Sequence, residues 1–142
     1  MARLESRVKM GFLPIDEIHQ DAILSLVKPA TPAHKLLDPS AGEGTFLEVA
    51  SRQWQMTAYA NELDGARAQK CIEKFGITQA VRSDALRLRA SNRAFSCLWV
   101  NPPYDIDKTA KNSKRVEFAM LRHSWKWAQE GGLVLWAVYQ HH

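Results

Sequence analysis

Four short apolar segments of the chain each run into an acidic residue or an asparagine, and helical patterns separate most of them. The segments cover residues 35–38, 56–62, 79–84 and 95–100, and the polar residues are Asp38, Glu62, Asp84 and Asn101. Alternating strand and helix patterns are typical of α/β domains whose strands run parallel. Because the carboxyl ends of parallel strands lie at one edge of the sheet, we expect these polar side chains to line one crevice.

The chain of 142 residues has the length of a single domain with one core. We predict a Rossmann-like α/β fold with a doubly wound, mostly parallel sheet. Helices are expected over residues 45–52 and 64–75, and the polar link before residue 95 predicts none. Two further helices each present an apolar stripe at helical spacing. The stripes are Ile15, Ile18, Ala22 and Leu26 near the N-terminus and Phe118, Leu121, Trp125 and Ala128 near the C-terminus.

The C-terminal part predicts one more strand. Gly131 and Gly132 are expected to end the last helix, and residues 133–139 to form a buried fifth strand. Trp125 and Trp127 fall on opposite faces of that helix, so one of them is expected to be exposed.

A glycine-containing turn, residues 38–46, leads from the first strand into a helix. Gly42 and Gly44 allow the backbone to approach a ligand closely at the end of a parallel strand. Leu47 stands where the dinucleotide fingerprint has its third glycine, and Glu43 would repel a pyrophosphate. The turn therefore favours a nucleoside ligand that carries positive charge and no phosphate. An ordinary strand–helix turn is the alternative interpretation.

Two further carboxylates strengthen the nucleoside interpretation. Glu62 follows Asp38 by 24 residues, close to the offset of about 20 residues at which an acidic side chain accepts ribose hydroxyls. Asp84 ends the third strand. Each acid alone is more often a helix cap, as we expect for Asp64, but together they predict a nucleoside pocket.

The tip of the fourth strand has the sequence Asn101-Pro102-Pro103-Tyr104. The two prolines remove backbone donors and stiffen the turn, which leaves the Asn101 side-chain oxygen and the Pro102 carbonyl as fixed acceptors. These acceptors and the Tyr104 ring suit a planar substrate that bears an NH₂ group.

These motifs resemble those of class I S-adenosylmethionine-dependent methyltransferases, and more narrowly those of the N6-adenine DNA methyltransferases of restriction–modification systems. Residues 38–46 resemble the glycine-containing cofactor motif, Glu62 the acid that holds the ribose, and Asp84 the acid that meets the adenine of the cofactor. Residues 101–104 resemble the catalytic motif. The order of the motifs resembles the gamma arrangement.

The resemblance implies S-adenosylmethionine as cofactor. Residues 114–118 are similar to the next motif of the family, and residues 11–14 to the element that covers the methionine end of the cofactor. Residues 1–34 would then be an arm and helix over the cofactor site, and residues 35–142 a core without the family's last two strands. The implied cofactor-binding residues are Phe12, Asp38, Pro39, Ala41, Gly42, Gly44, Phe46, Glu62, Leu63, Asp84, Ala85, Asn101 and Phe118.

The resemblance also implies methyl transfer to the N6 amino group of adenine in DNA, with Asn101, Pro102, Pro103 and Tyr104 as the catalytic residues. Similar motifs occur in enzymes that methylate adenine in rRNA or a protein glutamine amide, so rRNA and protein stay open as alternative substrates to DNA. A non-catalytic methyltransferase-like module completed by a partner is a third interpretation, because a fifth strand at the edge would lack a neighbour. A partner chain or a second copy could pair with it.

Charge supports a nucleic-acid partner modestly, since the chain has a formal net charge of +4. Residues 82–93 contain four arginines and one acid, and residues 104–126 contain six basic and three acidic residues. From the second group we expect phosphate contacts by Lys108, Lys111, Lys114 and Arg115.

Other classes of protein fit poorly. No apolar run approaches the ~18 residues of a membrane span, and the two cysteines, Cys71 and Cys97, are too few for a secreted disulfide framework. The histidines lack ligand spacing, so no metal site is predicted. We expect a cytoplasmic protein of bacterial, phage or mobile-element context with buried reduced thiols.

Overall fold

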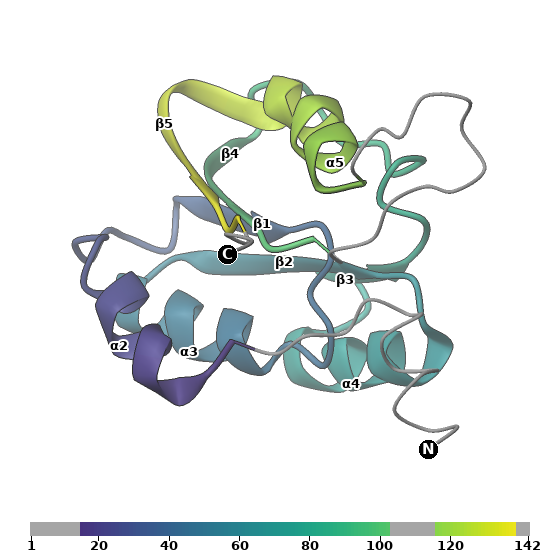
Figure 1. Cartoon of the computed structure of the whole chain (residues 1–142), viewed down its shortest axis with the longest axis horizontal. Helices are drawn as coiled ribbons and strands as arrows, with labels where there is room; N and C mark the ends of the chain where they lie inside the picture. The colour runs from purple at the N-terminus through teal and green to yellow at the C-terminus, as the bar shows by residue number, and fades with distance from the viewer. Residues whose placement is uncertain (1–14, 103–115, 139–142) are drawn as a thin grey trace, which may run out of the picture.

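The computed structural model describes residues 15–102 and 116–138 of the chain (Figure 1). Its helices are α2 (Glu17–Leu24), α3 (Thr45–Trp54), α4 (Gly65–Phe75), α5 (Val116–Ser124) and the short 3₁₀ helix η1 (Trp125–Trp127). Its strands are β1 (Lys35–Asp38), β2 (Thr57–Glu62), β3 (Ala80–Arg82), β4 (Phe95–Val100) and β5 (Ala128–Trp136). No helix is assigned between β3 and β4, as predicted.

The strands form one parallel sheet in the order β3-β2-β1-β4-β5. Leu36 of β1 pairs with Ala58 of β2 on one side and with Cys97 of β4 on the other. The chain thus winds outward from β1 to β3, returns to the centre and winds outward again to β5. This confirms the predicted doubly wound fold, in which ligands bind where the strand order reverses, outside the ends of β1 and β4.

A separate apolar cluster covers each face of the sheet, because successive strand residues point to opposite faces. Leu36 faces the cluster formed with α2, α3 and α4, whereas Leu37 faces the cluster that contains Met120 and Trp127. Figure 1 shows α2, α3 and α4 on one side of the sheet and α5 on the other.

The N-terminal helix does not bury the predicted stripe. Ile18 and Leu26 are 82% and 67% exposed, and Leu24 and Val27 are buried instead. Packing explains the difference, because Leu24 and Val27 face the cluster that contains Trp54, which is fully buried. The prediction followed apolar spacing alone, and this helix is too short for spacing to choose its buried face.

The stripe predicted for the last helix is also wrong, by one residue. Phe118 and Trp125 are 54% and 62% exposed, and the buried positions are Glu117, Met120, Ser124 and Trp127. The spacing of 3, 4 and 3 is preserved, but Met120 and Trp127 are the residues that meet the sheet. The prediction that one of Trp125 and Trp127 is exposed is confirmed.

The fifth strand differs from the prediction in bounds and burial. β5 begins at Ala128 and runs through Gly131 and Gly132, with a register shift opposite Phe95–Cys97 that accommodates them. It lies at the edge of the sheet, and Leu133 is 46% exposed. The strand is therefore only partly buried, because on its outer side no described strand pairs with it. Tyr139 lies outside the described residues.

The side chain of Trp54 ties α3 to the end of α2. It is fully buried, and its Nε1–H donates to the Leu24 carbonyl at 2.8 Å. We expect Trp54→Phe to lower the free energy of unfolding by about 2–4 kcal/mol, because it leaves a smaller ring and an unpaired buried carbonyl. Urea unfolding followed by circular dichroism measures this. The exposed Trp125→Phe is the control and should change stability by less than about 0.5 kcal/mol; equal effects of the two substitutions would contradict the expectation.

Candidate functional site

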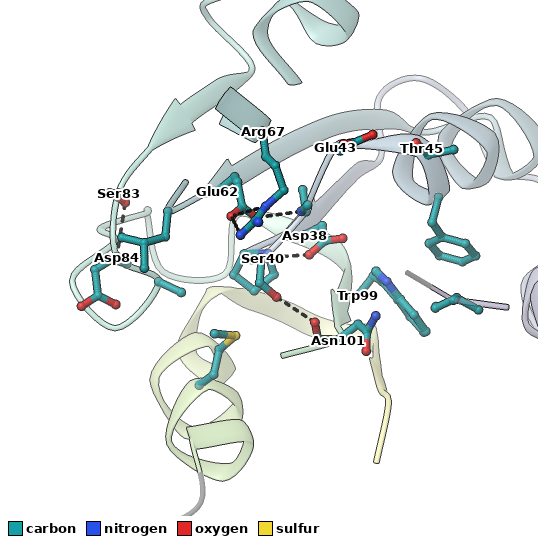
Figure 2. A pocket seen from close by; sticks show the side chains of 18 of the residues that line it. Asp38, Ser40, Glu43, Thr45, Glu62, Arg67, Ser83, Asp84, Trp99 and Asn101 are labelled. Atoms are coloured by element: carbon teal, nitrogen blue, oxygen red, sulfur yellow. Dashed lines mark hydrogen bonds and ion pairs between the residues drawn. The ribbon is translucent and has the colours of Figure 1, made fainter. Parts of the chain in front are cut away.

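A cavity of about 370 Å³ opens at the carboxyl edge of the sheet, at the point where the strand order reverses (Figure 2). Predicted site residues that line it are Asp38, Pro39, Ala41, Gly42, Phe46, Glu62, Leu63, Asp84, Ala85 and Asn101. Residues that were not individually predicted as site residues also line it: Ile15, Gln20, Ser40, Glu43, Thr45, Arg67, Ser83, Leu86, Trp99, Val116 and Met120. Of these, Ser40, Glu43, Thr45 and Val116 lie within the predicted motifs, and Ile15 and Gln20 within the predicted cover. The structure thus brings the strand-end carboxylates and Asn101 to one cavity.

The turn between β1 and α3 follows a path that requires glycine. Gly42 and Gly44 have φ angles of 61° and 80°, in the left-handed region that other residues adopt at a cost. A Cβ on Gly44 would lie 2.9 Å from Cε2 of Phe75. The turn is also fixed from the neighbouring strand, because the Ala41 N–H donates to the Asn61 carbonyl at 2.8 Å.

The buried carboxylate of Glu62 connects the turn to α4. Its Oε2 accepts the Gly42 N–H at 2.8 Å, and its Oε1 accepts the Asp64 N–H at 3.1 Å. Arg67 approaches the same Oε1, with Nε at 3.1 Å and Nη2 at 2.8 Å. Both side chains are largely buried, with 13% exposure for Arg67 and 6% for Glu62. Removal of either partner would therefore leave a buried charge uncompensated.

Arg67 was not among the predicted residues. It lies one turn into α4, and Asp64 caps that helix as predicted, because its carboxylate accepts the Arg67 N–H at 3.0 Å. Its position five residues after Glu62 was the signal available in the sequence, since the first turn of a helix folds back over the end of the preceding strand.

Asp38 is a second buried carboxylate in the cavity wall. It is 3% exposed, and its Oδ1 accepts the Ser40 N–H at 3.0 Å. Burial raises the pKa of Asp38 to about 8, against a smaller lowering by the Ser40 N–H, and the charge of Glu62 raises it further. A cation bound beside Asp38 would favour its ionised form.

Asn61 of β2 joins two loops beside the cavity. Its Nδ2 donates to the Pro39 carbonyl at 2.9 Å and to the Ser83 carbonyl at 3.1 Å, and its Oδ1 accepts the Ser83 hydroxyl at 2.7 Å. The side chain is 1% exposed with its polar atoms paired. Asn61 was not among the predicted residues either, although an amide next to the end of an apolar strand was a signal present in the sequence.

Asn101 extends from the end of β4 into the cavity, where its backbone carbonyl accepts the Ser40 hydroxyl at 3.0 Å (Figure 2). Trp99 and Phe46 form the adjacent wall, with ring centroids 4.8 Å apart. Pro102 is buried and does not line the cavity. The glycine turn and the tip of β4 are thus held together by one hydroxyl.

Asp84 lies across the cavity from this tip (Figure 2). β3 ends at Arg82, so Asp84 follows the third strand by two residues instead of ending it as predicted. Its side chain is exposed, and its Oδ1 accepts the Leu86 N–H at 2.9 Å. This bond holds the start of the link to β4 against the cavity wall.

Besides Pro102, two predicted residues lie elsewhere. Gly44 is buried beneath the turn against Phe75 and does not line the cavity. Phe118 points away, because the buried stripe of α5 is displaced by one residue, and Val116 and Met120 line the cavity in its place. The predicted residues Phe12, Pro103, Tyr104, Lys108, Lys111, Lys114 and Arg115 lie outside the described residues.

The raised pKa of Asp38 predicts a pH dependence of stability. Between about pH 4 and pH 8 the folded chain keeps a proton that the unfolded chain releases, so the free energy of unfolding should fall as the pH rises. Asp38→Asn should flatten this slope and be the more stable form at pH 8. Urea unfolding at pH 5, 6, 7 and 8 measures it.

The matched control for this measurement is Asp21→Asn on α2, where the side chain is exposed. It should keep the slope of the unsubstituted chain. An unchanged slope in Asp38→Asn would contradict the assignment of this titration to Asp38.

Membrane-spanning helices and grouped metal ligands are both absent from the described residues. None of the helices in residues 15–102 and 116–138 is long and apolar enough to cross a membrane. In the same part of the chain, no three His, Cys, Asp or Glu side chains are grouped as metal ligands.

Residues 1–141 match the model of a family described as an uncharacterised methyltransferase family, DUF6094. No curated protein matches the chain.

Solved structures share the fold. They include a type I restriction–modification system methyltransferase subunit from Streptococcus thermophilus, with a TM-score of 0.63 and 19% identity over 87% of this chain and 34% of that one. A geranyl diphosphate methyltransferase in complex with GPP and sinefungin has a TM-score of 0.60 and 16% identity over 81% of this chain and 42% of that one. A SAM-dependent methyltransferase from Aquifex aeolicus has a TM-score of 0.54 and 12% identity over 80% of this chain and 63% of that one. The chain spans less than two thirds of each of these proteins.

Proposed function

Since the chain belongs to the uncharacterised methyltransferase family DUF6094, we propose that its cavity binds S-adenosylmethionine and that the protein methylates the N6 amino group of adenine in DNA. The observation that supports this most is the convergence of Asp38, Glu62, Asp84 and Asn101 on one cavity. The acids suit a ligand with ribose hydroxyls and positive charge, and Asn101 suits a substrate with an NH₂ group.

The lining residues fit this cofactor part by part. Glu62 is held by Gly42 and Arg67, and its Oε2, which accepts one N–H in the structure, has a second lone pair for a ribose hydroxyl. The buried Asp38 offers a counter-charge to a sulfonium or an ammonium group. Leu63, Ala85 and Leu86 provide apolar contacts for a purine ring next to Asp84. Ile15 and Gln20 also line the cavity, which supports residues 1–34, with Phe12, as the cover of the cofactor site.

When bound, S-adenosylmethionine supplies a methyl group that the sulfonium already activates. The chain then has to position the acceptor nitrogen, whose lone pair is delocalised into the adenine ring. In this proposal the Asn101 side-chain oxygen accepts a hydrogen bond from the N6 amino group and directs its lone pair toward the methyl carbon, while Tyr104 stacks on the ring. The Pro102 carbonyl, predicted as a second acceptor, does not line the cavity in the structure. One N6 proton becomes acidic as the methyl group arrives and is released to water. The base leaves the duplex to reach the site, which costs a few kcal/mol that stacking partly offsets.

Two observations bear on the substrate: the first favours DNA, and the second favours a nucleic acid over a protein glutamine. One solved structure of the same fold is a restriction–modification methyltransferase subunit. The chain is also basic, with a formal net charge of +4, and Lys108, Lys111, Lys114 and Arg115 follow the Asn101 motif, where we propose phosphate contacts.

A further chain is proposed at the outer side of β5. Within the described residues this strand pairs with β4 alone, and Leu133 and Val138 are 46% and 54% exposed. An apolar edge of this kind accepts another strand, and a partner chain or a second copy would supply it.

Glu62→Gln tests the cofactor site. The substitution keeps the shape of the side chain and removes the charge that pairs with Arg67, so S-adenosylmethionine and S-adenosylhomocysteine should bind at least about tenfold more weakly. Isothermal titration calorimetry measures both affinities. Glu73→Gln, on the exposed side of α4, is the control and should bind both compounds like the unsubstituted chain.

The proposal for the cofactor fails if a folded chain binds neither compound, or if Glu62→Gln and Glu73→Gln bind them equally. Thermal unfolding of each variant shows whether it is folded.

Asn101→Ala tests the catalytic role. It should lower kcat by about a hundredfold or more and change the affinity for S-adenosylmethionine by less than about twofold, because the side chain acts on the substrate nitrogen. Ser40→Ala removes the hydroxyl that holds the Asn101 carbonyl and should lower kcat by a smaller factor. Transfer of labelled methyl groups to adenine-containing DNA, with rRNA and protein as parallel substrates, gives kcat and KM. Equal loss of cofactor affinity and kcat in Asn101→Ala would contradict this role.

A further inference from the structure

The link between β3 and β4 lies against the face of the sheet as an irregular segment with turns at residues 85–87 and 92–93, and it contains no helix. We call residues 84–93 of this link the arginine strap. Its apolar residues face inward: Ala85 is buried, and Leu88 and Ala90 pack against the cluster that contains Met120 and Trp127. The strap is therefore part of the packed structure on the side of the sheet that α5 also covers (Figure 1).

Hydrogen bonds fix the strap at both ends and at its middle. The N–H groups of Arg87 and Leu88 donate to the Asp84 carbonyl, each at 2.9 Å. His123 of α5 donates from Nε2 to the Leu88 carbonyl at 3.0 Å, and the Arg93 N–H donates to the Lys126 carbonyl at 2.9 Å. These hydrogen bonds fix the path of the strap's backbone, and with it the points from which its side chains extend.

Three of the four exposed charged residues of the strap are basic, the fourth being Asp84. Arg87, Arg89 and Arg93 are all exposed, and among the described residues no carboxylate forms an ion pair with any of them. Elsewhere in the described residues, Arg52 forms an ion pair with Glu48 and Lys70 forms one with Glu43. The strap therefore concentrates uncompensated positive charge on one short segment.

The strap begins at the wall of the cavity, because Asp84, Ala85 and Leu86 line it. From Arg87 to Arg93 an extended backbone reaches at most about 20 Å, at about 3.3 Å per residue. One strand of a duplex places about six phosphates along that length, at about 3.4 Å each. Guanidinium groups bind phosphate through paired N–H donors, so the row matches a linear polyanion that leads to the cavity.

We infer that Arg87, Arg89 and Arg93 of the arginine strap bind the phosphate backbone of the nucleic acid whose base enters the cavity. This inference rests on the proposed function for the identity of the substrate. The charge and the order of the strap apply to any nucleic acid, so DNA and RNA are separate arms of the test.

The test compares two double variants of the full chain that each remove two positive charges. Arg87→Gln/Arg89→Gln alters the strap, and Lys28→Gln/Arg52→Gln alters exposed residues next to α2 and on α3, against the opposite face of the sheet. Fluorescence anisotropy with a labelled 25-base-pair DNA duplex and a labelled single-stranded RNA, from 50 to 200 mM salt, gives Kd and its salt dependence.

The strap variant should bind nucleic acid at least about fivefold more weakly, and the slope of log Kd against log salt should fall by about 2. The control variant should stay within about twofold of the unsubstituted chain. Arg93→Gln, as a single variant, should lower the slope by about 1.

The inference is overturned if both double variants weaken binding equally, or if the unsubstituted chain binds neither nucleic acid. Calorimetry with S-adenosylmethionine on the same samples separates the two proposals. Loss of nucleic-acid binding in the strap variant, with no cofactor binding by any sample, supports the strap and contradicts the proposed function. If the samples bind the cofactor normally and the two double variants weaken nucleic-acid binding equally, the inference about the strap is contradicted and the proposed cofactor site is not.

Discussion

The carboxylate of Glu62 is the group on which the geometry of the cavity depends. It accepts the Gly42 N–H from the glycine turn, the Asp64 N–H from the start of α4, and two donors of Arg67. One buried charge therefore sets the turn, the start of the helix and the end of β2 in one arrangement. Such a charge is stable only while its donors stay in place, which explains why the turn is rigid where a ligand would meet it.

Asp38 lies close to this pair without a cationic partner of its own among the contacts that the structure records. Burial and the charge of Glu62 raise the pKa of Asp38 to about 8, so near neutral pH its protonated form predominates as long as no cation is bound beside it. A bound cation would reverse that preference. The cavity thus combines one carboxylate whose charge is compensated with a second whose charge is costly until a ligand arrives. That asymmetry is the physical reason why we propose the ribose at Glu62 and the positive charge near Asp38.

The strands and the residues at their ends were predictable from the sequence, whereas the faces of the helices were not. β4 matches its predicted bounds, and Asp38, Glu62, Asp84 and Asn101 meet as the order of strands required. The apolar stripes of α2 and α5 were wrong because several residues on each short helix satisfy helical spacing. The contacts of Trp54 and Trp127 with the sheet select among them. For the same reason Met120 and Val116, rather than Phe118, line the cavity.

Residue order and chemistry were sufficient to establish a parallel α/β sheet, a glycine turn and a row of polar strand ends, because these features depend on local patterns and on the polarity of parallel strands. Contacts between residues far apart in the chain required the folded structure. Arg67 reaching Glu62, Asn61 joining Pro39 to Ser83, and Ser40 holding Asn101 depend on how the loops settle above the sheet. The shift in the pKa of Asp38 belongs with them, since it comes from burial, which no spacing of residues encodes.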